Sequence, residues 1–173
     1  GFLETMNMSL TQPAYYKGID WTDSRHWVTI HNTSNESLNL LRPEMIIPTL
    51  ETVKRNVNRK QEDLRLFEFG KSYRQENELP QESEHLVITM TGQVEPSSWQ
   101  TGGGRRVDFF SIKAVVHSLL LRLGIKNWNV ESFTNSSGME FGLNYSVGNH
   151  AFLRFGKISG ELSSRFDVRQ EVY

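Results

Sequence analysis

Segments with the character of β-strands outnumber helical segments in this chain, and most of them follow one another along the sequence. Each is a run of β-branched and aromatic residues, often alternating with polar ones, between polar or glycine-rich stretches. The clearest runs cover residues 64–74, 85–91, 129–133, 141–147 and 151–158. This order predicts an α+β fold, in which an antiparallel sheet carries helices packed on it.

Two segments repeat their apolar residues at helical spacing. The first is expected to end at about Arg59 and to begin, or to break, near Pro48. Its apolar positions are Ile46, Ile47, Leu50, Val53 and Val57. The second begins after Asp108, which can cap its N-terminus, and Gly124 suits the position after its end.

Polar and glycine-rich composition predicts the connections between these elements. The polar stretch Gln75–Glu84 would join the first two strands as a long hairpin loop, and Gly148–Asn149 would make a tight turn. Residues Pro96–Arg106 are predicted to form a mobile loop. The segments Glu4–Leu10 and Trp27–Ile30 could each add a short strand near the N-terminus.

Composition excludes several kinds of site. The 173 residues include no cysteine, which rules out disulfides, thiol nucleophiles, cysteine-ligated zinc and iron–sulfur clusters. The five histidines have no metal-ligand spacing, so we expect no metal site. No apolar run approaches the roughly 18–20 residues of a membrane span. The formal charge of −1 does not favour strong non-specific binding to nucleic acid or to anionic membranes.

Charge is distributed unevenly along the chain. Residues 42–74 carry eight basic and five acidic side chains, which describes either a solvated helix face or an RNA-contacting patch. Residues 75–95 carry five glutamates and no Lys or Arg. The segment Gly102–Arg106 precedes the second helix and could hold a phosphate at its N-terminus. Because Asp108 would place a carboxylate there, we interpret this segment as a flexible loop.

Four segments occur in the order and at the separations found in one known family. They are Leu41–Glu44 opening the first helix, Leu66–Gly70 on a strand, Tyr73–Glu76 at its end and Val107–Lys113 opening the second helix. Together they resemble the β chain of bacterial phenylalanyl-tRNA synthetase, in its catalytic-like core, a relative of class II synthetase catalytic domains. The resemblance implies a single, non-catalytic class II-like domain over residues 1–173, which we interpret as part of a longer β chain cut at both ends.

The resemblance also suggests a candidate site. The second class II motif, an aromatic residue followed by Arg, any residue and Glu at the end of a strand, matches Tyr73–Glu76. In active enzymes of this class the arginine, here Arg74, grips the α-phosphate of ATP. The stretch that follows is acidic here, and carboxylates repel a triphosphate. We therefore interpret Arg74 and Glu76 as a vestigial motif. The third motif is not found, since Gly156–Gly160 with Arg165 lacks its spacing and its following apolar helix.

Glu68 and Arg74 are both expected to serve structure. Glu68 lies between Phe67 and Phe69, so strand alternation puts it on the face opposite those rings. If a helix covers that face, the carboxylate needs a partner, and a nearby arginine or a backbone N–H would supply it. Glu68 is therefore a structural candidate, and we expect no catalytic residue in this chain.

By resemblance, the parent enzyme is cytoplasmic, attaches phenylalanine to tRNA with ATP and Mg²⁺, and pairs two α with two β chains. The α chain would perform the chemistry. This segment would be an inactive scaffold without a cofactor of its own, and other parts of the complex would make most of the tRNA contacts. Two alternatives are an adenylate-forming domain that uses Arg74 and an RNA-contacting module built on residues 42–74. The family's first-motif helix would precede Gly1, so we expect part of the apolar strand of residues 2–10 to be exposed or held by a neighbouring copy.

Overall fold

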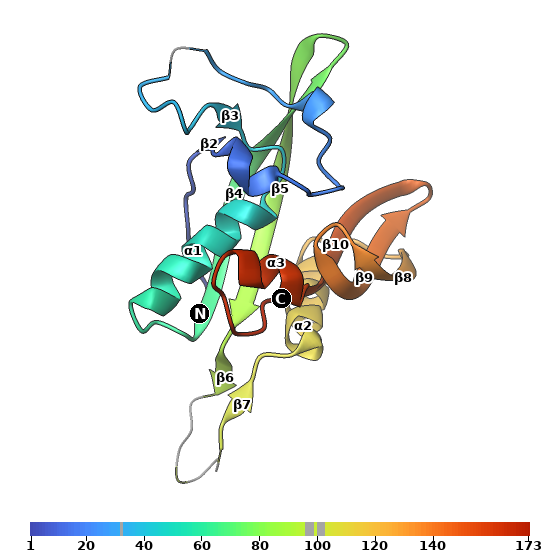
Figure 1. Ribbon diagram of the computed structural model, residues 1–173. Helices are drawn as coiled ribbons and strands as arrows, with labels where there is room; N and C mark the ends of the chain where they lie inside the picture. The colour runs from blue at the N-terminus through green and yellow to red at the C-terminus, as the bar shows by residue number, and fades with distance from the viewer. Residues whose placement is uncertain (32, 96–98, 100–102) are drawn as a thin grey trace. The chain divides into compact units, whose positions relative to one another are not determined.

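Figure 1 shows the computed structural model of the chain, which describes residues 1–31, 33–95, 99 and 103–173. The chain forms two compact units. The N-terminal unit holds residues 1–59 and 65–88, and the C-terminal unit holds residues 60–64 and 89–173. Both units combine antiparallel strands with α-helices, which confirms the predicted α+β class.

A three-stranded sheet of order β1-β4-β5 organises the N-terminal unit. Its strands are β1 (Leu3–Glu4), β4 (Leu64–Glu76) and β5 (Leu79–Thr91). Only Asn77 and Glu78 separate β4 from β5, and their φ angles of 49° and 65° are the left-handed values that a two-residue hairpin turn requires. The prediction of a long loop over Gln75–Glu84 is therefore wrong, because these polar residues continue the two strands.

Helix α1 (Ile46–Asn58) begins near Pro48 and ends next to Arg59, as the apolar spacing predicts. Pro48 lies in the first turn, where backbone N–H groups have no partner within the helix, so its missing N–H costs nothing. The Glu44 carboxylate accepts a hydrogen bond from the backbone N–H of Ile47 at 3.0 Å and so satisfies this end. The apolar face is buried through Ile47, Leu50 and Val53.

The N-terminal segments are less regular than predicted. Strand character in residues 4–10 is confined to the flanks, β1 and β2 (Leu10–Thr11), and β2 pairs antiparallel with β3 (Leu40–Leu41). The predicted strand Trp27–Ile30 reduces to a single bridge between Thr29 and Leu40. Two 3-10 turns occupy the connection, at Pro13–Tyr16 and Ser24–His26.

The C-terminal unit contains a second three-stranded sheet, antiparallel and of order β10-β9-β8. Its strands are β8 (Asn129–Ser136), β9 (Met139–Val147) and β10 (His150–Ile158). Gly148 and Asn149 alone connect the pair Val147 and His150, which confirms the predicted tight turn. After β10 comes a short helix, α3 (Gly160–Arg165), capped by the Ser159 side chain.

Helix α2 (Phe109–Arg122) packs against the sheet of the C-terminal unit, and its ends follow the prediction. The Asp108 carboxylate accepts the backbone N–H of Ser111 at 2.7 Å, and the Ser111 hydroxyl is in turn 3.3 Å from the Asp108 N–H, which makes a capping box. Gly124 has a φ of +68° beyond the end of the helix. The Phe109 ring stacks on Phe155 of β10 at 5.5 Å, which joins the helix to the sheet.

The connection before α2 is partly regular. Strand β6 (Gln93–Glu95) pairs antiparallel with β7 (Arg105–Arg106), so the predicted mobile loop does not extend over Arg105 and Arg106. Residues 96–98 and 100–102 of that prediction lie outside the described part of the chain. Among the described helices, none has both the length and the apolar character needed to cross a membrane.

Candidate functional site

The motif that sequence analysis singled out lies near the tip of the β4–β5 hairpin. Arg74 and Glu76 are both exposed on β4. In the described part of the chain, the Arg74 side chain makes no ion pair and no hydrogen bond. The exposed glutamates of the hairpin are Glu76, Glu78, Glu82 and Glu84, and Lys71 pairs with Glu82 at 2.6 Å. Among the described residues the Arg74 side chain is therefore an unpaired cation on an acidic hairpin.

Glu68 lies six residues before Arg74 on β4 and is buried. Its Oε1 is 2.8 Å from Nη1 of Arg42, and both side chains are 3% exposed. Asn7 donates two further hydrogen bonds to the Glu68 carboxylate, from its backbone N–H at 3.1 Å and from its side-chain amide at 2.6 Å. The same amide group of Asn7 accepts a hydrogen bond from the hydroxyl of Thr52 on α1. The partner of Glu68 is thus Arg42, while Arg74 lies apart from it.

The face of β4 around Gly70 is covered by side chains of its own unit. A Cβ atom at Gly70 would collide with the Arg42 guanidinium and with the end of the Met45 side chain. Further along, the hydroxyl of Ser72 lies 2.7 Å from Nε2 of His85 on β5. Burial, and then the nearby Arg42 charge, lower the pKa of His85. Arg42 is therefore the central cation of this face, and Glu68 neutralises it.

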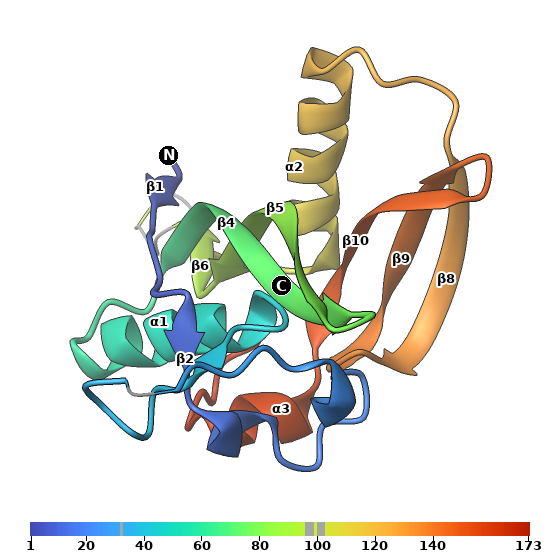
Figure 2. The same ribbon diagram turned by 90° about the horizontal axis from the view of Figure 1, so that it is seen from above.

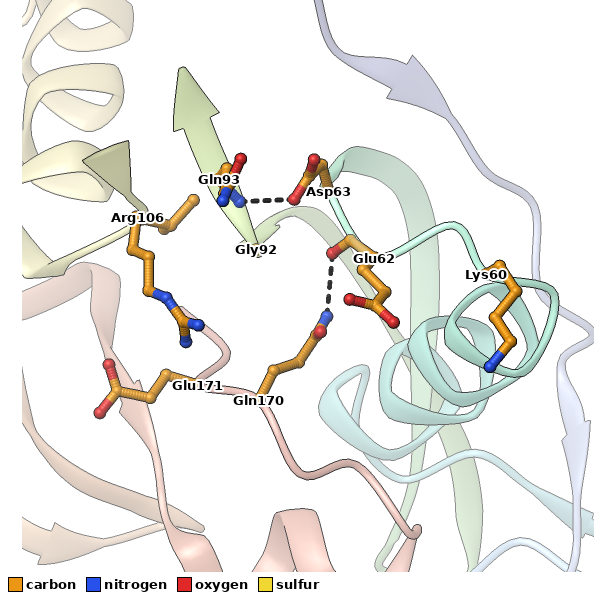
Figure 3. Close-up of a pocket in the computed structure, with 9 residues that line it drawn as sticks. Lys60, Glu62, Asp63, Gly92, Gln93, Arg106, Gln170 and Glu171 are labelled. Carbon is orange, nitrogen blue, oxygen red and sulfur yellow. Dashed lines mark hydrogen bonds between the residues drawn. The ribbon is translucent and has the colours of Figure 1, made fainter. Parts of the chain in front are cut away.

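A cavity of about 310 Å³ lies in the C-terminal unit (Figure 3). It is built from four separate stretches of chain. Asp63 accepts a hydrogen bond from the backbone N–H of Gln93 at 2.7 Å, and the Gln170 side chain donates to the carbonyl of Glu62 at 3.0 Å. Charged side chains of both signs line it: Lys60, Glu62, Asp63, Arg106 and Glu171.

This cavity has the wrong charges for a triphosphate. Its acids outnumber its cations, and the Glu171 carboxylate is kept ionised because Lys157, at 2.8 Å, lowers its pKa. No cluster of three or more potential metal ligands occurs among the described residues. Sequence reasoning missed the cavity, because its walls come from segments that are distant along the chain and carry no motif.

Two further candidates from the sequence can be placed. Of the possible phosphate-binding segment Gly102–Arg106, Gly102 lies outside the described residues, and Asp108 occupies the start of α2 with its carboxylate. A helix, α3, begins at Gly160, but it is short and mostly polar (GELSSR), and Arg165 lies in its last turn. This helix has six residues, and Arg165 is exposed.

The fold is that of a class II tRNA synthetase. A pyrrolysyl-tRNA synthetase from Desulfitobacterium hafniense superimposes on 99% of this chain with a TM-score of 0.69 and 16% sequence identity, and the match covers 58% of that chain. A second structure of the enzyme from this organism gives a TM-score of 0.68.

Comparison of the sequence identifies the family to which the chain belongs. It belongs to the family described as the phenylalanyl tRNA synthetase beta chain CLM domain, whose model matches residues 1–173. The phenylalanine–tRNA ligase beta subunit of Bacteroides thetaiotaomicron is 33% identical over 184 residues, and that of Porphyromonas gingivalis is 33% identical over 187. Each match covers all of this chain and 22% of the relative, so the chain spans about a fifth of their length. The family resemblance inferred from the sequence is confirmed.

Proposed function

We propose that this chain is a catalytically inactive part of a phenylalanine–tRNA ligase β subunit and that it serves the assembly of the enzyme. The observation that carries the proposal is the environment of Arg74. Phosphoryl chemistry requires positive groups preorganised around the phosphates. Here the single motif-like arginine stands on a hairpin with four exposed glutamates, and Glu68 already neutralises the other central cation, Arg42.

ATP and Mg²⁺, which the family implies for the parent enzyme, do not fit these residues. The face of β4 is covered at Gly70 by Arg42 and Met45, and the hairpin would repel a triphosphate. We therefore assign adenylate formation, and with it ATP and Mg²⁺, to a companion α chain. The transfer of phenylalanine to tRNA would occur in that α/β complex, with two copies of each chain.

Exposed apolar side chains support the assembly role. Leu3, Met6 and Met8 of the N-terminal segment are 67%, 92% and 65% exposed, and Phe69 on the adjacent strand is 68% exposed. Exposed apolar side chains that form a contiguous patch commonly mark an interaction site. A stable contact would bury at least about 1,000 Å² in total, which a companion chain or another part of the β subunit could supply.

An RNA-contacting role for residues 42–74 remains the second hypothesis, with weaker support. Basic residues of this segment are engaged within the chain, for example Arg42 with Glu68 inside the unit and Lys71 with Glu82 on the hairpin. A binding isotherm with tRNA at two salt concentrations tests this role, because phosphate contacts weaken steeply with salt.

Calorimetric titration of the chain with Mg-ATP and phenylalanine tests the proposed inactivity. We expect no dissociation constant tighter than roughly 1 mM, which corresponds to about −4 kcal/mol. The matched sample is the same chain combined with an α chain from the same organism, in which binding should appear. Binding by the isolated chain with a tighter constant, lost in Arg74→Ala, would support an adenylate-forming domain instead.

A further inference from the structure

Strand β8 is the outer strand of the C-terminal sheet, and its second edge has no partner strand in the described part of the chain (Figure 2). The strand has eight residues, of which six are exposed, including Val130 at 51%. Edge strands are usually protected by lysines, prolines, bulges or short length. Strand β8 has no Lys, Arg or Pro, and Glu131 is its one charged residue. It therefore presents unpaired backbone groups to another strand.

An arginine without a carboxylate partner lies beside this edge. The guanidinium carbon of Arg154 is 4.0 Å from the centre of the Phe133 ring of β8. Its Nη1 donates to the hydroxyl of Ser137 at 2.6 Å, and its Nη2 donates to the carbonyl of Ser136 at 3.2 Å. Among the described residues no carboxylate lies within ion-pair distance of Arg154. A carboxylate on a strand that pairs with β8 near Phe133 would lie close to the Arg154 guanidinium.

The register of the sheet places these groups on one face. Residue pairs directly opposite in an antiparallel ladder share a face. Glu131 lies opposite Asn144, which lies opposite Arg154 on its other side, so Glu131, Arg154 and Phe133 share one face. Tyr145 and Phe155 point to the other face, where their rings contact each other at 5.4 Å.

We propose that two copies of this chain pair through β8, antiparallel and centred on Ser132, to form a continuous six-stranded sheet. A two-fold axis perpendicular to the sheet pairs residues of the same face, so one residue of β8 must lie opposite itself. Centring on Glu131 would oppose two carboxylates, which destabilises a strand pair. Centring on Phe133 would require Asn135, whose φ is +47°, to continue the ladder.

The register centred on Ser132 avoids both problems. It uses the regular part of the strand and places Val130 opposite Thr134 of the second copy. It also places Glu131 opposite Phe133 of the second copy. The Arg154 guanidinium of that copy lies over this Phe133 ring. The two-fold axis repeats this contact. The dimer would therefore bring each Glu131 carboxylate close to the Arg154 guanidinium of the other copy.

A cysteine scan tests this register, since the chain has no native cysteine. In Ser132→Cys the two sulfur atoms would lie across the axis, at a Cα separation within disulfide range. We expect Ser132→Cys to give a covalent dimer under mild oxidation. Val130→Cys and Thr134→Cys should not do so alone but should form a mixed disulfide when combined. Equal cross-linking of all three single variants, or none with Ser132→Cys, would overturn the proposal.

Sedimentation equilibrium of the cysteine-free chain supplies a test without a covalent trap. We expect a concentration-dependent dimer that Ser132→Lys abolishes, because two ammonium groups would then lie opposite each other. Glu131→Gln should raise the dissociation constant of the dimer about 2- to 10-fold. Leu121→Glu, at an exposed position on α2, is the control and should leave the dimer unchanged. A wild-type monomer at every concentration, or a dimer that only Leu121→Glu disrupts, would contradict pairing through β8.

Discussion

Arg42 and Glu68 form an ion pair in the interior of the N-terminal unit, with 2.8 Å between Nη1 and Oε1. Each group has further partners. Nε of Arg42 donates to the carbonyl of Lys71 at 2.8 Å, and Glu68 accepts two hydrogen bonds from Asn7. The pair therefore joins three segments: the N-terminal strand region, the approach to α1, and β4. Buried charges persist only when they are paired and hydrogen-bonded in this way.

Glu68→Gln should destabilise the chain strongly, because it leaves the Arg42 guanidinium buried without a counter-charge. Breaking one member of a buried pair costs about 3–5 kcal/mol. For a chain of this size a loss of 1 kcal/mol lowers Tm by about 2–4 °C, so a fall of roughly 6 °C or more should appear in thermal unfolding. Glu76→Gln on the exposed tip is the control, with an expected change within about 0.5 kcal/mol. An unchanged Tm in Glu68→Gln would show that the pair adds nothing to stability.

The capping box of α2 gives a smaller, local prediction. Asp108→Ala removes the acceptor for the Ser111 N–H and should cost about 1 kcal/mol of unfolding free energy in urea titrations. Asp108→Ser keeps an oxygen at the cap and should recover most of the loss. Equal stability of the two variants would indicate that the cap does not limit the stability of this helix.

The start of α1 should make stability depend on pH. Burial raises the pKa of Glu44 from 4.5 to about 7, although the N–H groups of Ile47 and Ile46 oppose the rise. The unfolded chain then releases this proton at lower pH than the folded chain, so stability declines as pH rises from about 4.5 to 7. Glu44→Gln should remove this part of the dependence, about 1–3 kcal/mol in size, in urea titrations across that range. A parallel pH profile for the two proteins would contradict a raised pKa.

The elements that were predicted correctly carry a strong apolar pattern. Helix α2 has apolar residues on its buried face and polar caps at its start, and both signals are local in sequence. The hairpin loop was predicted wrongly for the opposite reason. Residues 75–84 are mostly polar and, apart from the half-buried Gln75, exposed, so nothing in their pattern distinguishes a strand from a loop. The positive φ angles of Asn77 and Glu78 become visible only in the structure.

The contacts of the candidate site could likewise be predicted only in part from the sequence. Alternation around Glu68 indicates which face it occupies, but the identity of its partner depends on a contact 26 residues away with Arg42. Asn7, between β1 and β2, also has distant partners, since its side chain hydrogen-bonds with Glu68 and Thr52. Such pairings follow from the tertiary fold, and no periodicity in the sequence records them.

The exposed apolar side chains of the N-terminal unit should form part of the contact with a companion α chain. Asn7 contacts the buried Glu68, whereas its neighbours Met6 and Met8 are 92% and 65% exposed and Phe69 on β4 is 68% exposed. Met6→Asp combined with Phe69→Asp places charge in this patch and should weaken binding to a matching α chain at least about tenfold, which is the effect of losing one well-buried contact. Light scattering after size exclusion, with titration calorimetry, measures the association. The control is Leu79→Asp at the hairpin tip, where an apolar side chain of similar exposure should be replaceable without loss of affinity. Since both sites are exposed, Tm should change little in either variant. Undiminished affinity in the double variant would exclude this patch from the α-chain contact.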